Sequence, residues 1–145
     1  MPTASDDGLI YLDASALVKV VIEEEESAVL RAWIAGGPNR ISSVVTAVEL
    51  RRAARRVAGQ AKEAKALELR RETEVVLGGI HLLTLDEDIA QRAAALDPTT
   101  LRSLDAIHVA TALTIDGLEH FVTYDLRLAD AATKAGLVVT MPGTR

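Results

Sequence analysis

The chain has 145 residues, of which 49% are hydrophobic and none is cysteine, and its formal net charge at pH 7 is −5. This length suits one domain spanning residues 1–145, with residues 1–8 and 142–145 frayed, and the lack of cysteine excludes disulfides and thiolate metal sites. The negative net charge argues against a protein that binds nucleic acid over its whole surface.

Short apolar runs alternate with helical patterns along the chain. We expect strands at residues 9–12, 40–45, 80–85, 119–123 and 137–140. We expect helices at residues 16–22, 23–33, 46–59, 60–77, 86–96, 103–115 and 126–135. This order predicts an α/β fold, a three-layer α/β/α domain with a mainly parallel central sheet.

Four acidic residues stand where predicted strands end or in the helices that follow: Asp13, Glu49, Asp105 and Asp125. In an open α/β sheet these positions converge on one rim, so acids far apart in sequence share a pocket. Asp105 is the most informative, because its neighbours in residues 104–113 are mostly apolar and a lone buried carboxylate is costly. Carboxylate ligands suit Mg²⁺ or Mn²⁺. Without metal, close carboxylates should raise one another's pKa.

Each acid also has a purely structural interpretation. Asp13 and Asp125 stand where helix N-caps are expected, and Glu49 follows Thr46 at the spacing of a capping box. Asp105 would favour the dipole of its own helix. Capping does not explain acids at three strand exits together with one inside an apolar helix, so we prefer a shared cation.

Two hydroxyls and one imidazole accompany the acids. Ser15 and Thr123 each stand two residues from an acid, and they either ligate or orient water at the rim or serve as a cap and a strand residue. His108 lies one helical turn after Asp105 on the same face. For His108 we favour a packed, hydrogen-bonded role over contact with a phosphate.

Two reactions fit such a pocket. A metal-activated water can attack a phosphodiester, or Asp13 can accept a phosphoryl group, as in aspartyl-phosphate enzymes. Against the second, no carboxylate follows Asp13 by two residues. A cationic cluster, either a phosphate-binding face or a solvated helix face, comprises Arg51, Arg52, Arg55, Arg56, Lys62, Lys65, Arg70 and Arg71.

Four segments resemble those of the PIN-domain ribonucleases, and among them the VapC toxins of prokaryotic toxin–antitoxin modules. They are Ile10–Lys19 (IYLDASALVK), Thr46–Leu50 (TAVEL), Leu101–Ala112 (LRSLDAIHVATA) and Val122–Ala129 (VTYDLRLA). The resemblance covers nearly the whole chain, and it implies a magnesium or manganese site. The residues implied for it are Asp13, Glu49, Asp105 and Asp125, with Thr123 at a nearby hydroxyl position.

The resemblance also implies partners. It implies cleavage of single-stranded RNA, a homodimer, and inhibition by a small antitoxin protein whose tail occupies the active-site groove. Three alternatives stay open: a housekeeping PIN-type RNA-processing nuclease, a magnesium-dependent phosphohydrolase, and a non-catalytic binding domain. No apolar run has the roughly 20 residues of a membrane helix, and the first residues do not look like a secretory leader. We therefore expect a cytoplasmic protein without membrane contacts.

Overall fold

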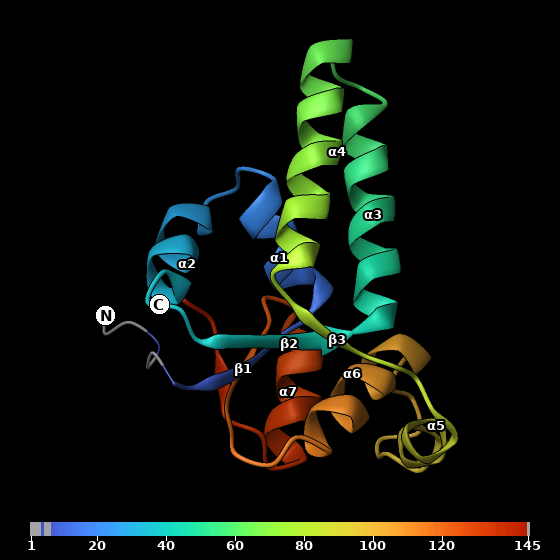
Figure 1. Cartoon of the computed structure of the whole chain (residues 1–145). Coiled ribbons are helices and arrows are strands. Elements are labelled where there is room, and N and C mark those ends of the chain that lie inside the picture. The colour runs from blue at the N-terminus through green and yellow to red at the C-terminus, as the bar shows by residue number, and fades with distance from the viewer. Residues whose placement is uncertain (1–3, 5–6, 145) are drawn as a thin grey trace.

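A computed structural model of the chain describes Ala4 and residues 7–144 (Figure 1). The strands are β1 (Leu9–Leu12), β2 (Asn39–Ser43), β3 (His81–Leu83), β4 (Leu118–Val122) and β5 (Val139–Thr140). The helices are α1 (Ala14–Val21), α2 (Ser27–Ile34), α3 (Val44–Ala58), α4 (Glu63–Gly78), α5 (Glu87–Ala94), α6 (Ser103–Leu113) and α7 (Leu126–Lys134).

The strands of the described residues form one sheet in the order β3-β2-β1-β4-β5, and all their pairings are parallel. β1 is central, where Tyr11 pairs with Ile41 of β2 on one side and with Phe121 of β4 on the other. Helices α1–α4 lie on one face of the sheet and α5–α7 on the other (Figure 1). The predicted three-layer α/β/α fold with a parallel sheet is therefore confirmed.

Alternate side chains of β1 serve the two helical layers, because successive side chains of a strand point to opposite faces. Ile10 and Leu12 pack into the core made with α1–α4, whereas Tyr11 packs with Phe121 against α6 and α7. All four of these side chains are fully buried. Such a continuous apolar run is typical of a parallel strand covered on both faces.

Helix α3 begins two residues before the predicted start at Thr46. Ser43 is its N-cap, and the Ser43 hydroxyl accepts a hydrogen bond from the Val45 N–H at 3.1 Å. The Thr46 hydroxyl instead lies 2.7 Å from the Ser42 hydroxyl. The capping-box interpretation of Glu49 is therefore wrong, because Glu49 stands in the second turn of α3 rather than in the first.

Helix α2 also starts later than predicted. The acidic run before Ser27 forms a turn rather than the first turn of a helix. The Ser27 hydroxyl fixes this turn, since it accepts from the Glu24 N–H at 2.9 Å and donates to the Ile22 carbonyl at 3.1 Å. The β3 strand is likewise shorter than the predicted 80–85, because residues 84–86 lead into α5 without pairing.

Parts of the two segments that we expected to be frayed make defined contacts. Ala4 is buried, and its N–H donates to the Trp33 carbonyl at 3.0 Å. Near the other end, the Pro142 carbonyl accepts from the Tyr124 hydroxyl at 2.6 Å. Residues 1–3, 5–6 and 145 lie outside the described residues.

Helices α3 and α4 run side by side and extend beyond the rest of the molecule (Figure 1). Leu50 and Ala54 of α3 share one core with Leu69 and Leu77 of α4. In the part of the chain that the structure describes, no helix is both long enough and apolar enough to cross a membrane.

Candidate active site

Asp13 lies at the carboxyl end of the central strand and caps α1. Its side chain is only 3% exposed. One carboxylate oxygen, Oδ1, accepts from the Ala16 N–H at 2.9 Å and lies 2.7 Å from the Ser15 hydroxyl, while Oδ2 accepts from the Thr123 hydroxyl at 2.6 Å. Burial nevertheless raises the pKa of Asp13, because these hydrogen bonds only partly offset the loss of water. The predicted capping role of Asp13 is confirmed.

Ser15 and Thr123 tie the ends of the two central strands together. The Ser15 hydroxyl accepts from the Tyr124 N–H at 2.9 Å, and it lies 3.3 Å from the Thr123 hydroxyl. Thr123 in turn accepts from the Asp125 N–H at 3.1 Å. Both hydroxyls therefore orient Asp13 from fixed backbone positions.

Asp125 follows β4 and caps α7, as predicted. Its Oδ1 accepts from the N–H groups of Arg127 and Leu128 at 2.9 and 3.2 Å. Unlike Asp13, Asp125 is exposed. The carboxylate is thus held by its helix while its other oxygen, Oδ2, takes no part in the two capping bonds.

Glu49 is joined to the core through His108. Imidazole Nε2 of His108 lies 2.7 Å from Glu49 Oε1, and Nδ1 lies 2.7 Å from the Tyr11 hydroxyl. An ionised carboxylate only accepts, so Nε2 carries the proton that it donates to Glu49. In neutral His108, Nδ1 then accepts from Tyr11, whose pKa is raised by burial so that the hydroxyl keeps its proton.

Aromatic contacts fix this hydrogen-bonded chain of Tyr11, His108 and Glu49. The Tyr11 ring stacks on Phe121, with ring centroids 5.1 Å apart and planes 2° apart. It meets His108 edge to face, with centroids 5.9 Å apart. His108 is 2% exposed, whereas the Glu49 side chain is 28% exposed. His108 is therefore the packed, hydrogen-bonded residue that the sequence favoured, and it also holds an acid at the rim.

Asp105 stands half-buried in the first turn of α6. Its pKa is raised, first by burial and then by the negative charges of Asp125 and Glu49, while His108 and Arg102 act in the opposite direction. Asp105 is thus close enough to both Asp125 and Glu49 to be repelled by them. A cation at this rim would relieve that repulsion.

The acids fit a hard cation by their chemistry, since their donors are carboxylate oxygens. Within the described residues, however, no three acidic or histidine side chains form a cluster compact enough to hold a metal ion. Asp13 has both oxygens engaged by hydroxyl and backbone donors. Asp105 thus interacts with Asp125 and Glu49, and Asp13 stands at the end of β1, but the described residues do not form a complete ligand sphere.

Two separate hollows adjoin this rim near the start of α6, where Leu104 lines one and Asp105 lines the other. The larger, about 590 Å³, lies between α1 and α3, has Glu49 and Arg52 on its wall, and is otherwise mainly apolar. The smaller, about 230 Å³, includes Arg102. Arginine side chains therefore line both hollows next to the acids.

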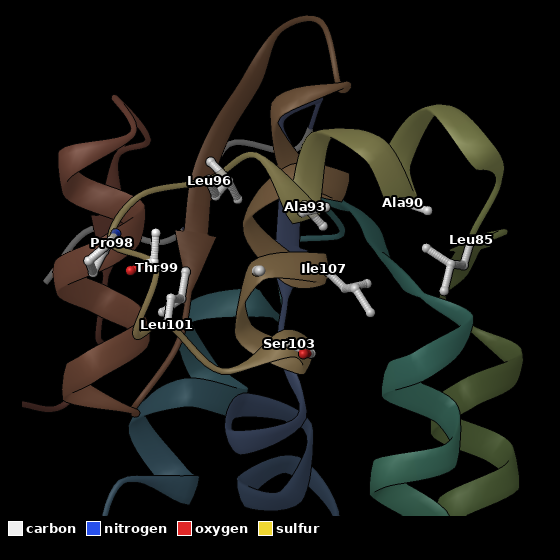
Figure 2. Close-up of a pocket in the computed structure, with 11 residues that line it drawn as sticks. Leu85, Ala90, Ala93, Leu96, Pro98, Thr99, Leu101, Ser103 and Ile107 are labelled. Carbon is white, nitrogen blue, oxygen red and sulfur yellow. The ribbon is translucent and has the colours of Figure 1, made fainter.

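A third hollow, of about 350 Å³, has none of the four acids in its lining (Figure 2). It is formed by α5, α6 and the loop between them, where small side chains such as Ala93 face Ile107 and Leu96. Its lining includes no charged side chain, and its hydroxyls are those of Thr99 and Ser103. It is therefore not where the predicted chemistry would take place.

The cationic cluster divides into two groups. Arg51 is paired with Glu74 at 2.8 Å, and Lys65 lies 3.4 Å from Glu68. Arg52 and Arg56 instead line the larger hollow with Glu49. Only part of the predicted basic face is thus directed at the rim.

The sequence did not reveal two residues of this region. We interpreted Tyr11 only as part of an apolar strand. A buried tyrosine needs a hydrogen-bond partner for its hydroxyl, and this requirement is a signal for a polar neighbour in the core. Arg102 directly precedes α6, and its charge acts on Asp105. No local pattern connects either residue with the rim, because their neighbours there come from other elements.

Comparisons with known proteins agree with this fold. The family model described as PIN domain matches residues 10–134. A Mycobacterium tuberculosis protein named ribonuclease VapC47 is 39% identical over 142 residues, which cover 93% of this chain and 98% of that protein. The crystal structure of M. tuberculosis VapC20, titled a sarcin-ricin loop cleaving toxin, has a TM-score of 0.68 at 16% identity and covers 92% of this chain and 99% of that one. A toxin–antitoxin complex from Klebsiella pneumoniae has a TM-score of 0.63 at 25% identity, covering 92% and 97%.

Proposed function

The chain belongs to the PIN-domain family, and from that premise we propose that it is a metal-dependent endoribonuclease, the toxin of a type II toxin–antitoxin pair. One observation carries the proposal. Asp105 lies near enough to Asp125 and Glu49, which come from two other elements, for their charges to raise its pKa. Acids arranged in this way favour a bound cation over a solvated surface.

We propose that the acids hold Mg²⁺ or Mn²⁺. The residues are Asp13, Glu49, Asp105 and Asp125. When bound, such an ion supplies a Lewis acid for a phosphodiester and a means to activate water at neutral pH. The aspartyl-phosphate alternative is disfavoured, since Asp13 is 3% exposed and its two oxygens already accept from three groups.

The accessory residues would act on the acids rather than on the RNA. Ser15 and Thr123 hold the Asp13 carboxylate in one orientation, with hydroxyl–carboxylate distances of 2.7 and 2.6 Å. His108 holds Glu49 through Nε2. These three are therefore positioning residues, because each touches an acid and none needs to touch a phosphate.

The larger hollow suits an antitoxin segment. Apolar side chains such as Val45, Val48 and Leu104 line it, and Glu49 and Arg52 stand beside them. An amphipathic segment seated there would cover Glu49 and block the rim. The Klebsiella complex, titled toxin–antitoxin, supports such a partner. We also propose a homodimer, as the family resemblance implies, in the cytoplasm.

The test is cleavage of a total small-RNA pool by purified protein, with Mg²⁺ or Mn²⁺ against a chelator. An Asp105→Asn variant prepared in the same way excludes contaminating nuclease. Metal-dependent cuts made only by the wild-type chain are the expected result, and mapping them names the substrate. Equal cutting by both proteins, or none by either after removal of any co-purified antitoxin, would contradict the proposal.

A further inference from the structure

The smaller hollow beside Asp105 contains two arginines from different elements. Arg102 immediately precedes α6, and Arg127 stands in the first turn of α7. Both side chains are exposed, and both line the same space of about 230 Å³ as Asp105. Their placement follows from the fold, because α6 and α7 both begin at the rim where the acids stand.

Neither arginine forms a salt bridge within the described residues. The other acid of the hollow, Asp130, is instead paired with Lys134 at 2.8 Å. Arg92, by comparison, is paired with Asp88 at 2.9 Å, although Arg52, Arg55, Arg56, Arg70 and Arg71 also form no salt bridge among the described residues. The two guanidinium groups of the hollow are therefore available to an anion, and their planar donors suit phosphate oxygens.

The N-terminus of α6 also favours an anion in the smaller hollow. Its N-cap position is occupied by Arg102, which makes no side-chain capping hydrogen bond. The first N–H groups of a helix need acceptors from outside the helix and favour anions. In α1, α3, α5 and α7 a capping side chain accepts from these groups, whereas α2 and α4 resemble α6 in having no side-chain cap.

We propose that Arg102 and Arg127 form a phosphate-binding subsite that holds the RNA strand next to the bond cleaved at the acids. This rests on the proposed function. The strand would then pass from Arg52 and Arg56, in the larger hollow, across the acids to the smaller hollow. An acidic rim on a chain of net charge −5 repels RNA, and cations on both sides of the rim offset that repulsion.

The experiment measures binding of a fluorescein-labelled single-stranded RNA oligonucleotide by anisotropy at several salt concentrations. It uses the full chain in an Asp13→Asn background, in which the proposed function predicts no cleavage. In that background the double replacement Arg102→Gln with Arg127→Gln should weaken binding about 25-fold at 0.1 M salt and reduce the slope of log K against log salt by about 1.4. An Arg92→Gln control removes an exposed arginine of α5 and should leave both quantities unchanged.

Three outcomes overturn the proposal. If the double variant binds RNA like its parent, the subsite is wrong while the proposed function stands. If Arg92→Gln weakens binding as much, the effect is one of net charge and no subsite exists. If the parent binds no RNA and the wild-type chain cleaves none, the proposed function fails and the subsite fails with it.

Discussion

His108 Nε2 and Glu49 Oε1 lie 2.7 Å apart although 59 positions separate the two residues in the sequence. Behind His108, the Tyr11 hydroxyl bonds the other imidazole nitrogen at 2.7 Å. The orientation of an acid at the rim is thus set by a buried side chain of the central strand. This makes Tyr11 the most direct place to test whether Glu49 must be held.

Replacing Tyr11 by Phe removes the hydroxyl and keeps the ring on Phe121. We expect a loss of about 1–3 kcal/mol in the free energy of unfolding, because Nδ1 of His108 loses its buried partner. We also expect kcat to fall with little change in KM, since Glu49 is held less well. Urea denaturation and steady-state RNA cleavage measure the two effects.

Tyr124→Phe is the matched control for Tyr11→Phe. Its hydroxyl donates to the Pro142 carbonyl at 2.6 Å, and among the described residues it forms no hydrogen bond to a carboxylate. This variant should lose stability without losing kcat. If both variants lower kcat in proportion to stability, Tyr11 has only a structural role.

Thr123→Val tests the hydroxyl that donates to Asp13 at 2.6 Å. Valine fills the same buried space but removes one donor to Asp13 Oδ2, while Ser15 and Ala16 still donate to the carboxylate. We expect a loss of about 1.5–3 kcal/mol, the range for hydrogen bonds to charged groups, together with a loss of cleavage. Thr123→Ser keeps the hydroxyl and should retain cleavage; equal behaviour of the two variants would assign the effect to packing.

The stability of the metal-free protein should depend on pH through Asp13 and Asp105. Their pKa values are raised above the ordinary 3.8, so the folded chain keeps protons that the unfolded chain has released. The free energy of unfolding should therefore fall as the pH rises from about 4 through the raised values. Chemical denaturation in chelator at a series of pH values measures this, and Asp13→Asn should flatten the profile. A profile unchanged by the substitution would contradict the assignment to Asp13.

Adding Mg²⁺ should stabilise the wild-type chain. A ligand that binds only the folded state contributes about 2.7 kcal/mol at 100 times its Kd. Thermal melts with and without Mg²⁺ should show this as a rise in Tm that Asp105→Asn abolishes. In chelator the variant should melt at the wild-type temperature or slightly above it, because repulsion from Asp125 and Glu49 is relieved. If Asp105→Asn unfolds and the Tm of the wild-type chain does not change with Mg²⁺, the acids have a structural role and do not bind metal.

The sequence predicted the order of elements and the rim at which the acids stand, because strand and helix patterns and the rule for parallel sheets are local or topological. It did not predict the start of α3. Thr46 and Glu49 fit a capping box in sequence. In the structure, however, Ser43 caps the helix, and the Thr46 hydroxyl is hydrogen-bonded to the Ser42 hydroxyl. A local pattern cannot choose between two hydroxyls that compete for one helix end.

The chain of Tyr11, His108 and Glu49 was likewise beyond prediction in detail. Each residue comes from a different element, and the contact between Tyr11 and His108 spans 97 positions. The periodicity of α6 placed His108 on a buried face, but not beside any particular acid. Contacts of this kind follow from the packing of α3 and α6 on the sheet, which no single segment of sequence contains.

The middle position of β1 means that the rim is assembled from both ends of the chain. During synthesis Asp13 and Glu49 emerge first, but His108, Thr123 and the two remaining acids come from α6 and from the segment between β4 and α7. A ribosome that stalls or terminates before α6 therefore releases a fragment without half of the acids. We therefore expect a fragment that ends before α6 to cleave no RNA, because it lacks Asp105, Asp125 and the imidazole that holds Glu49.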